Sequence, residues 1–293
     1  MSENIKILLL GDSALTRGLA HRLSDREDTE VYANFDVEGV IKADLEPMDF
    51  GDIADFCAGH EIDILLPGSG EAITTGIRDY MQHRIDTEGL EVISPTHQGA
   101  LMEGSREYGK ELMMEAEILT PRYMSVDRET LGEGLAFLES LQAPYLIKAD
   151  GYIPTGGVKR ASTLPEAKDD LEDMVVDNGL GEAGQKAVIE EFVQGTDSSL
   201  SLYVDAEGYL ILHCDDGADF CLNAEKRAVA PTMSLLKERD PEFRGFIRLG
   251  LLNLQGEPIL LSYSVSTCDC QATPESLGDC AARILQPYIK NRH

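Results

Sequence analysis

The first hundred residues alternate short apolar runs with segments of helical periodicity, and this alternation constrains the fold more than any other feature of the sequence. "IKILLLG" (5–11) is a continuous apolar run that ends in Gly, which is typical of a strand buried on both faces of a parallel sheet. Further strands are expected at 30–34, 62–68 and 90–95, and helices at 12–23, 51–60 and 71–84. This order predicts βαβ units and a doubly wound parallel sheet.

Beyond Thr96 the pattern changes to helices interspersed with hairpins. Helices are expected at 99–118, with a break near Gly104, at 128–141, from a capping box at Thr163 to about 177, and at 275–290. Strands are expected at 143–150 and 185–195, and hairpins at 198–212 and 245–265. The sequence thus predicts an α/β unit followed by an α+β unit.

The charge balance limits the partners. With 53 acidic and 25 basic residues the formal net charge is −28, so most of the surface repels a polyanion and nucleic acid is not an expected partner. No apolar stretch approaches the roughly 20 residues needed to cross a bilayer, and Met1–Lys6 has no signal-peptide pattern. We therefore expect a cytoplasmic protein without a membrane partner; the sequence identifies no protein partner.

The six cysteines give no metal-binding pattern. Only Cys268 and Cys270 lie close together, as a CxC without a second pair to complete a zinc site. We expect reduced and mostly buried thiols.

A loop at residues 145–161, "YLIKADGYIPTGGVKRA", is the first candidate site. An apolar strand ends in Lys148, and the glycines after it, Gly151, Gly156 and Gly157, allow backbone amides to approach an anion. This pattern predicts that the loop holds phosphates.

A second segment, "VIEEFVQGTDSSL" (188–200), follows some 40 residues later. It offers an apolar strand, the carboxylates of Glu190 and Glu191, and Asp197 just after a Gly. With the first loop it could hold a purine nucleotide, with adenine along the strand edge and ribose on a carboxylate. Alternatively, both segments are surface charges that flank two core strands.

These segments carry a resemblance to a known family. Together with "SPTHQGALMEGSREYGKELM" (94–113) and, more faintly, "GFIRLGLLNLQGEPILLSYS" (245–264), they resemble phosphoribosylamine–glycine ligase, an ATP-grasp enzyme of purine biosynthesis. The resemblance implies a pre-ATP-grasp α/β domain at 1–98 and an ATP-grasp domain at 99–293, with a mobile lid subdomain at about 120–193. It also implies ATP bound between two antiparallel sheets, and an acyl phosphate of glycine captured by the amine of phosphoribosylamine.

The resemblance also implies roles for individual residues. Arg106, Lys148 and the glycine loop would contact phosphate, and Asp197 would take the place of a ribose-binding Glu. Adenine would meet the backbone of four consecutive residues, Glu190, Glu191, Phe192 and Val193.

The sequence departs from the family pattern in several places. The second Lys of the family's phosphate loop is Gly156, a Lys after the GS dipeptide is Arg106, and the N-terminal substrate loop has Arg17 out of register. A Gly-rich segment after an HKR-type sequence and the family's C-terminal domain are also not found.

The metal position is the largest departure. The family's Mg²⁺ ligands lie in an EFN motif, and the Glu and Asn align with Ser262 and Ser264. Neutral hydroxyls are poor replacements for an anionic ligand, and Asp269 is the carboxylate that remains nearby. These serines could equally form one polar face of a strand. We therefore expect no metal site here and regard Mg²⁺ as a doubtful cofactor, whereas ATP is a candidate.

Three functional hypotheses follow. The favoured one is a degenerate ATP-grasp protein that binds ATP or a related small ligand with little or no ligase turnover. The alternatives are an active ATP-dependent carboxylate–amine ligase, for glycinamide ribonucleotide or another product, and a protein-interaction scaffold built on the same fold.

Overall fold

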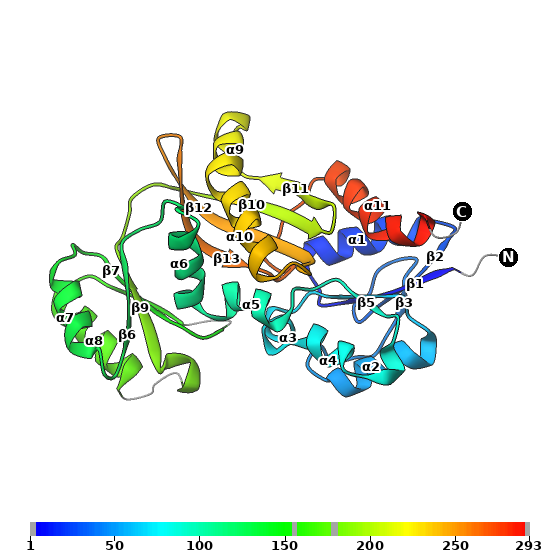
Figure 1. Cartoon of the computed structure of the whole chain (residues 1–293), viewed down its shortest axis with the longest axis horizontal. Coiled ribbons are helices and arrows are strands. Elements are labelled where there is room, and N and C mark those ends of the chain that lie inside the picture. Colours follow the sequence, from blue (N-terminus) through cyan, green and yellow to red (C-terminus); the bar gives the residue numbers. More distant parts are fainter. Residues whose placement is uncertain (1–3, 154–156, 177–180, 291–293) are drawn as a thin grey trace.

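The structure of the protein is a computed structural model, which describes residues 4–153, 157–176 and 181–290. Three sheets follow one another along the length of the molecule (Figure 1). A five-stranded sheet has the order β3-β2-β1-β4-β5, and two four-stranded sheets have the orders β11-β10-β12-β13 and β6-β9-β7-β8. We call the last two the central sheet and the lid sheet.

The N-terminal sheet is parallel throughout, which confirms the predicted doubly wound fold. Its strands are β1 (Ile5–Leu10), β2 (Thr29–Ala33), β3 (Ile41–Lys42), β4 (Ile64–Pro67) and β5 (Glu91–Val92). Alternate residues of β1 are buried against α1 (Ala14–Ser24) on one face and α2 (Phe50–His60) on the other. Burial on both faces explains why β1 is a continuous apolar run.

The helix expected at 71–84 is two helices, so this prediction was wrong in its extent. The structure has α3 (Gly70–Thr75) and α4 (Ile77–Gln82), separated by Gly76 with φ +94°. A left-handed residue ends a helix, and glycine adopts that conformation without a steric penalty.

The central sheet is built from the two predicted hairpins. It contains β10 (Thr196–Asp205), β11 (Gly208–Cys214), β12 (Gly245–Leu254) and β13 (Glu257–Ser264), all paired antiparallel. Gln255 and Gly256 both have positive φ, as a two-residue hairpin turn requires.

Helices cover one face of the central sheet. They are α5 (His97–Gly104), α6 (Arg106–Glu115), α9 (Ala218–Ala224) and α10 (Ala230–Arg239), with a π-helical turn at Glu225–Val229. Leu200 and Leu249 pack in one core with Leu112 and Phe220. The break between α5 and α6 lies where the sequence predicted it, whereas α9 and α10 were not predicted.

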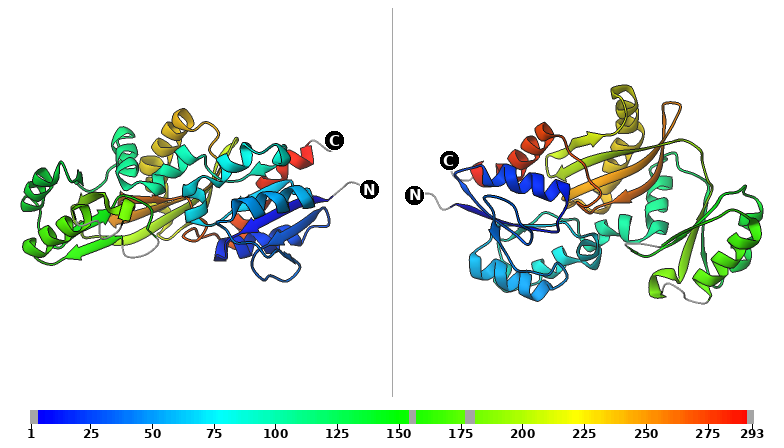
Figure 2. Two further views of the ribbon diagram at one scale, coloured as in Figure 1. Left: turned by 90° about the horizontal axis from the view of Figure 1, so that it is seen from below. Right: turned by 180° about the vertical axis from the view of Figure 1, so that it is seen from behind.

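The opposite face of the central sheet packs against the N-terminal unit through β10 and β12. Tyr203 and Phe246 share a core with Leu19 of α1 and Ile284 of α11 (Pro274–Lys290). The helix α11 lies beside α1 at the end of the molecule away from the lid sheet (Figures 1 and 2).

The lid sheet forms the other end of the molecule (Figure 2). It contains β6 (Tyr123–Asp127), β7 (Tyr145–Ala149), β8 (Val158–Ala161) and β9 (Lys186–Glu190), and α7 (Leu131–Glu139) and α8 (Leu164–Val175) pack on it. Thr163 caps α8 as predicted, but Glu166 accepts from the amide of Ser162 and not from that of Thr163. The domain limits near 98 and the mobility of the lid stay predictions.

Candidate nucleotide site

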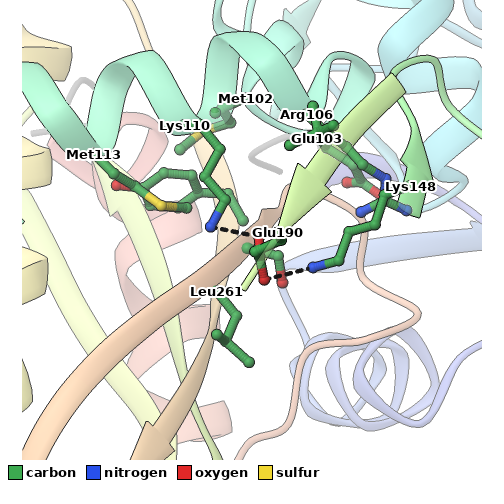
Figure 3. Close-up of a pocket in the computed structure, with 12 residues that line it drawn as sticks. Met102, Glu103, Arg106, Lys110, Met113, Lys148, Glu190 and Leu261 are labelled. Atoms are coloured by element: carbon green, nitrogen blue, oxygen red, sulfur yellow. Dashed lines mark hydrogen bonds and ion pairs between the residues drawn. The ribbon is translucent and has the colours of Figure 1, made fainter. Parts of the chain in front are cut away.

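A small pocket lies where α5 and α6 meet the lid sheet and strand β13 (Figure 3). It is lined by Met102, Glu103, Arg106, Gly109, Lys110, Met113, Lys148, Val188, Glu190, Leu261, Ser262 and Tyr263. Three residues predicted to bind nucleotide, Arg106, Lys148 and Glu190, are thus brought together. The cavity volume is about 30 Å³, which is the room that one water molecule needs.

Glu190 lies between two lysines at the centre of this pocket. Lys148 Nζ is 2.8 Å from Glu190 Oε1, and Lys110 Nζ is 2.6 Å from Glu190 Oε2. The side chains of Glu190, Lys110 and Lys148 are 1%, 4% and 13% exposed. A buried carboxylate is stable only when it is paired, and these two ammonium groups provide the pairing. The sequence analysis missed Lys110, because a Lys within a predicted helix is usually exposed.

Burial and charge act against each other on these groups. Burial lowers the pKa of Lys110 to about 8, although Glu190 acts in the opposite direction. Burial alone would raise the pKa of Glu190, but the charges of Lys148 and Lys110 outweigh it, so this pKa lies below its usual value. The pocket lining therefore sets three cationic side chains, Arg106, Lys110 and Lys148, against the two carboxylates of Glu103 and Glu190.

The predicted phosphate loop begins against the N-terminus of α6. Asp150 accepts from the backbone amide of Glu107 (2.7 Å) and from the hydroxyl of Ser105 (3.0 Å), and Arg106 Nε donates to the carbonyl of Ala149 (3.0 Å). These bonds place Arg106 beside Lys148. Further along this loop, Gly151 forms an isolated bridge with Ser105, and the Gly157 carbonyl accepts from the amide of Ala149, whereas Gly156 lies outside the described residues.

The residues after Glu190 point to different surroundings. The carboxylate of Glu191 pairs with Arg122 (2.9 Å), and the ring of Phe192 lies under the guanidinium of Arg160. Val193 is half-buried at the link to the central sheet. None of these three side chains lines the pocket, so what they could offer a nucleotide there is their backbone.

Asp197 lies at the start of β10 and is exposed. Because side chains alternate along a strand, Asp197 and Ser199 point to the same face of the central sheet, the face opposite α5, α6, α9 and α10. Among the hydrogen bonds of the described residues, none is accepted by the Asp197 carboxylate, so a turn-capping role for it is not observed.

The two serines at the family's metal position lie beside a carboxylate that the sequence analysis missed. Ser264 Oγ is 3.1 Å from Glu103 Oε2 and 3.2 Å from Asp269 Oδ2, and Ser262 lines the pocket. Glu103 also accepts from the backbone amides of Val265 and Ser266. Burial raises the pKa of Glu103, and Asp269 acts in the same direction. A Glu directly before the "GS" dipeptide was the available signal.

This donor set does not fit a divalent cation. Ser262 and Ser264 offer only neutral oxygens, Glu103 uses one oxygen for two amides and a hydroxyl, and Asp269 is the one further carboxylate that contacts Ser264 in the described residues. Within the described ranges, no group of three or more His, Cys, Asp or Glu side chains could hold a metal ion.

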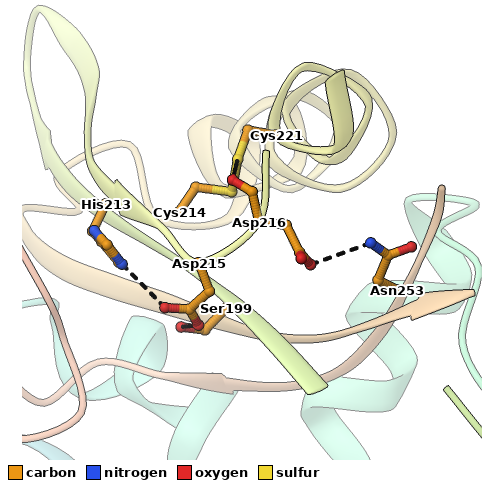
Figure 4. Close-up of a disulfide and its surroundings, with 7 residues drawn as sticks. All are labelled: Ser199, His213, Cys214, Asp215, Asp216, Cys221 and Asn253. Carbon is orange, nitrogen blue, oxygen red and sulfur yellow. Dashed lines mark hydrogen bonds and ion pairs between the residues drawn. A yellow bond between two sulfur atoms is a disulfide. The ribbon is translucent and has the colours of Figure 1, made fainter. Parts of the chain in front are cut away.

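Two of the cysteines form a disulfide, which corrects the expectation of reduced thiols. Cys214 at the end of β11 is bonded to Cys221 in α9 (Figure 4). The other described cysteines, Cys57, Cys268, Cys270 and Cys280, are free. The prediction failed at this pair because a separation of seven residues carries no disulfide signal by itself.

The chain was compared with known protein families and structures. Residues 5–103 match the N domain and residues 104–217 the ATP-grasp (A) domain of phosphoribosylglycinamide synthetase. Phosphoribosylamine–glycine ligase of Neisseria meningitidis serogroup B is 26% identical over 302 residues, which cover 92% of this chain and 70% of the relative. Phosphoribosylamine–glycine ligase of Pseudomonas putida is 32% identical over 215 residues, which cover 70% of this chain and 48% of the relative.

Solved structures show the same fold at lower identity. Phosphoribosylamine–glycine ligase of Thermotoga maritima has a TM-score of 0.71 at 19% identity, covering 93% of this chain and 71% of its own. D-alanine–D-alanine ligase of Bacillus anthracis complexed with ATP has a TM-score of 0.61 at 16% identity, covering 99% and 97%. No helix in the described part of the chain is long and apolar enough to cross a membrane. The chain belongs to the phosphoribosylglycinamide synthetase family of ATP-grasp proteins.

Proposed function

We propose that this protein binds ATP, or a closely related nucleotide, between the central sheet and the lid sheet, with little or no ligase turnover. The observation that carries the proposal is the convergence of Arg106, Lys110 and Lys148 on one pocket between the two sheets. Three cations in a half-enclosed space favour a polyanionic ligand, and a nucleotide triphosphate is the one that this family's fold takes.

In this proposal Lys148 and Arg106 contact phosphate oxygens, Asp197 accepts from the ribose hydroxyls, and the backbone of 190–193 meets adenine. A cavity of about 30 Å³ has no room for a nucleotide. Binding therefore requires the lid sheet to move away from the central sheet, and phosphate replaces Glu190 as the partner of Lys148.

Two features of the structure support low turnover. The position of the family's metal ligands holds neutral hydroxyls, and the donor set there does not fit Mg²⁺. In the N-terminal substrate loop, Arg17 is bound to both Asp12 oxygens and to the carbonyl of Asp36, so its guanidinium is engaged. Loss of one positioned charged group typically lowers turnover by about 10²- to 10³-fold, and here several such groups are replaced.

The second candidate is an active carboxylate–amine ligase, which the names of the relatives favour. The two proposals differ in one measurement. Purified protein is given phosphoribosylamine, glycine, ATP and Mg²⁺, and release of ADP and glycinamide ribonucleotide is followed. We expect ATP binding in calorimetry without either product. Glycine-dependent turnover at about 1 to 10³ per second would establish the ligase instead.

A further inference from the structure

The face of the central sheet opposite α5, α6, α9 and α10 carries a row of polar side chains. His213, Ser201, Arg248 and Ser264 are direct neighbours across the four strands β11, β10, β12 and β13. Directly opposed residues of antiparallel strands point to the same face, so one guanidinium lies in a row with two hydroxyls and an imidazole.

The next row of residues lies between Arg248 and the pocket. Ser199, Gly250 and Ser262 are neighbours in this row, two residues along each strand. A Cβ atom added at Gly250 would lie 2.6 Å from Ser262 Oγ and 3.7 Å from Arg248 Nη1. The missing side chain at Gly250 thus leaves room for the guanidinium to reach toward Ser262, which lines the pocket with Lys148.

In the described part of the chain, Arg248 forms no ion pair. No carboxylate oxygen of the described residues lies within 4.0 Å of its nitrogens. Asp215 also lies on this face, and it is bound to Ser199 Oγ (2.7 Å) and His213 Nε2 (3.0 Å). Burial alone would raise the pKa of Asp215; the bonds from Ser199 and His213 and the charge of Arg248 lower it.

A half-buried and unpaired guanidinium is unusual in a chain of net charge −28. The residues opposite and beside it, Ser264 and Ser262, are those that replace the family's metal ligands. A carboxylate at either position would pair with Arg248, whereas the carboxylates that are present, Glu103 and Asp269, contact the Ser264 hydroxyl and form no ion pair with Arg248.

We infer that Arg248 binds a phosphate group of the nucleotide at the position where metal ligands are missing, so that the nucleotide is held without a divalent cation. The planar guanidinium suits two phosphate oxygens at once, and the Ser262 hydroxyl lies beside it, whereas the Ser264 hydroxyl already donates to Glu103 and Asp269. Lys148 and Arg106 act on the phosphates from the lid side. This inference rests on the proposed nucleotide binding.

The test measures the affinities of ATP and of inorganic tripolyphosphate by calorimetry, once with Mg²⁺ and once with EDTA. For the wild-type protein we expect affinities that agree within about two-fold in the two buffers. Arg248→Gln should weaken both ligands by about 10- to 100-fold, the usual effect of a lost charged hydrogen bond. The affinities of Arg248→Lys should lie between those of wild type and Arg248→Gln, because Lys keeps the positive charge and loses the planar, two-pronged donor group.

Lys237→Gln on α10 is the matched control, because it removes an exposed positive charge on the helix-covered side. It should leave both affinities unchanged. If Arg248→Gln melts below the assay temperature, Arg248→Lys carries the test, and wild-type affinity in that folded variant overturns the bidentate contact.

The outcomes separate the two proposals. ATP binding only with Mg²⁺, or equal affinity in Arg248→Gln and wild type, overturns the role of Arg248 and leaves the proposed function in place. Tripolyphosphate binding that depends on Arg248, without ATP binding, supports the anion site and overturns the proposed function. Binding of neither ligand overturns both.

Discussion

Lys148 Nζ lies 2.8 Å from Glu190 Oε1, so a residue expected to meet phosphate is already neutralised by a residue expected to lie at adenine. Lys148 on β7 and Glu190 on β9 are diagonal neighbours on adjacent strands. The carboxylate holds the place that an anionic ligand would take. Nucleotide binding at this site is therefore an exchange of one anion for another, which weakens the apparent affinity.

Lys148→Ala should lower ATP affinity by about 10- to 100-fold, because it removes a charged hydrogen bond. It should also lower the free energy of unfolding by about 1–3 kcal/mol, since Glu190 keeps only Lys110. Calorimetry and urea denaturation measure the two effects. Lys168→Ala on α8, whose partner Glu139 is exposed, is the surface control. If Lys148→Ala and wild type bind ATP equally tightly, the proposed contact between this loop and phosphate is refuted.

Asp197→Ala should weaken ATP binding by about 10-fold or more and leave the melting temperature nearly unchanged. The reason is that Asp197 is exposed and no hydrogen bond to its carboxylate is seen within the described ranges. Paired titrations and melting curves provide the measurement, with Asp197→Glu as the conservative variant that should retain affinity. A lower melting temperature with unchanged affinity would indicate a structural role for Asp197.

Lys110 should make stability depend on pH. Its pKa in the folded protein is about 8, below the value of an exposed Lys, so above pH 8 the unfolded chain binds more protons than the folded one. The free energy of unfolding therefore gains from this group as pH rises from 8 toward about 10, by at most about 1.4 kcal/mol per pH unit.

Urea denaturation of wild type and Lys110→Met at pH 7, 8, 9 and 10 isolates this contribution. The difference in unfolding free energy between the two proteins should grow with pH above 8. Lys237→Met on the exposed surface of α10 serves as control and should show a constant difference from wild type. A difference between wild type and Lys110→Met that does not change with pH would contradict the lowered pKa.

Reduction should destabilise the central sheet. The Cys214–Cys221 bond closes a short loop between β11 and α9, and a loop of this length contributes about 2–3 kcal/mol in the chain-entropy account. Dithiothreitol should lower the unfolding free energy of wild type by that amount. The double variant Cys214→Ser, Cys221→Ser should start lower and show no response, whereas Cys268→Ser should respond as wild type does.

A thiol titration in denaturant gives an independent check of the disulfide. The sequence has six cysteines and the structure leaves four free, so four should react before reduction and six after it. Six reactive thiols in the oxidised protein would show that this pair is not bonded.

The sequence by itself determined the parts of this protein that depend on neighbours along the chain. The apolar run of β1, the cap at Thr163 and the hairpin turn at Gln255–Gly256 were predicted because periodicity, capping and turn preference are local properties. The helix at 71–84 failed for a reason that is also local, since Gly76 ends α3 in a left-handed conformation that apolar periodicity does not reveal.

Only the tertiary structure decided which charges meet. Lys110 on α6 approaches Glu190, which lies 80 positions later in the chain. Glu103 on α5 reaches Ser264 on β13. The pairing of β12 with β13 places Arg248 opposite Ser264. These contacts depend on how strands pair and how helices cross the sheet, and a shift of one residue in register would turn each strand side chain to the other face. The residue types were visible in the sequence, but their pairing is a property of the packed sheets.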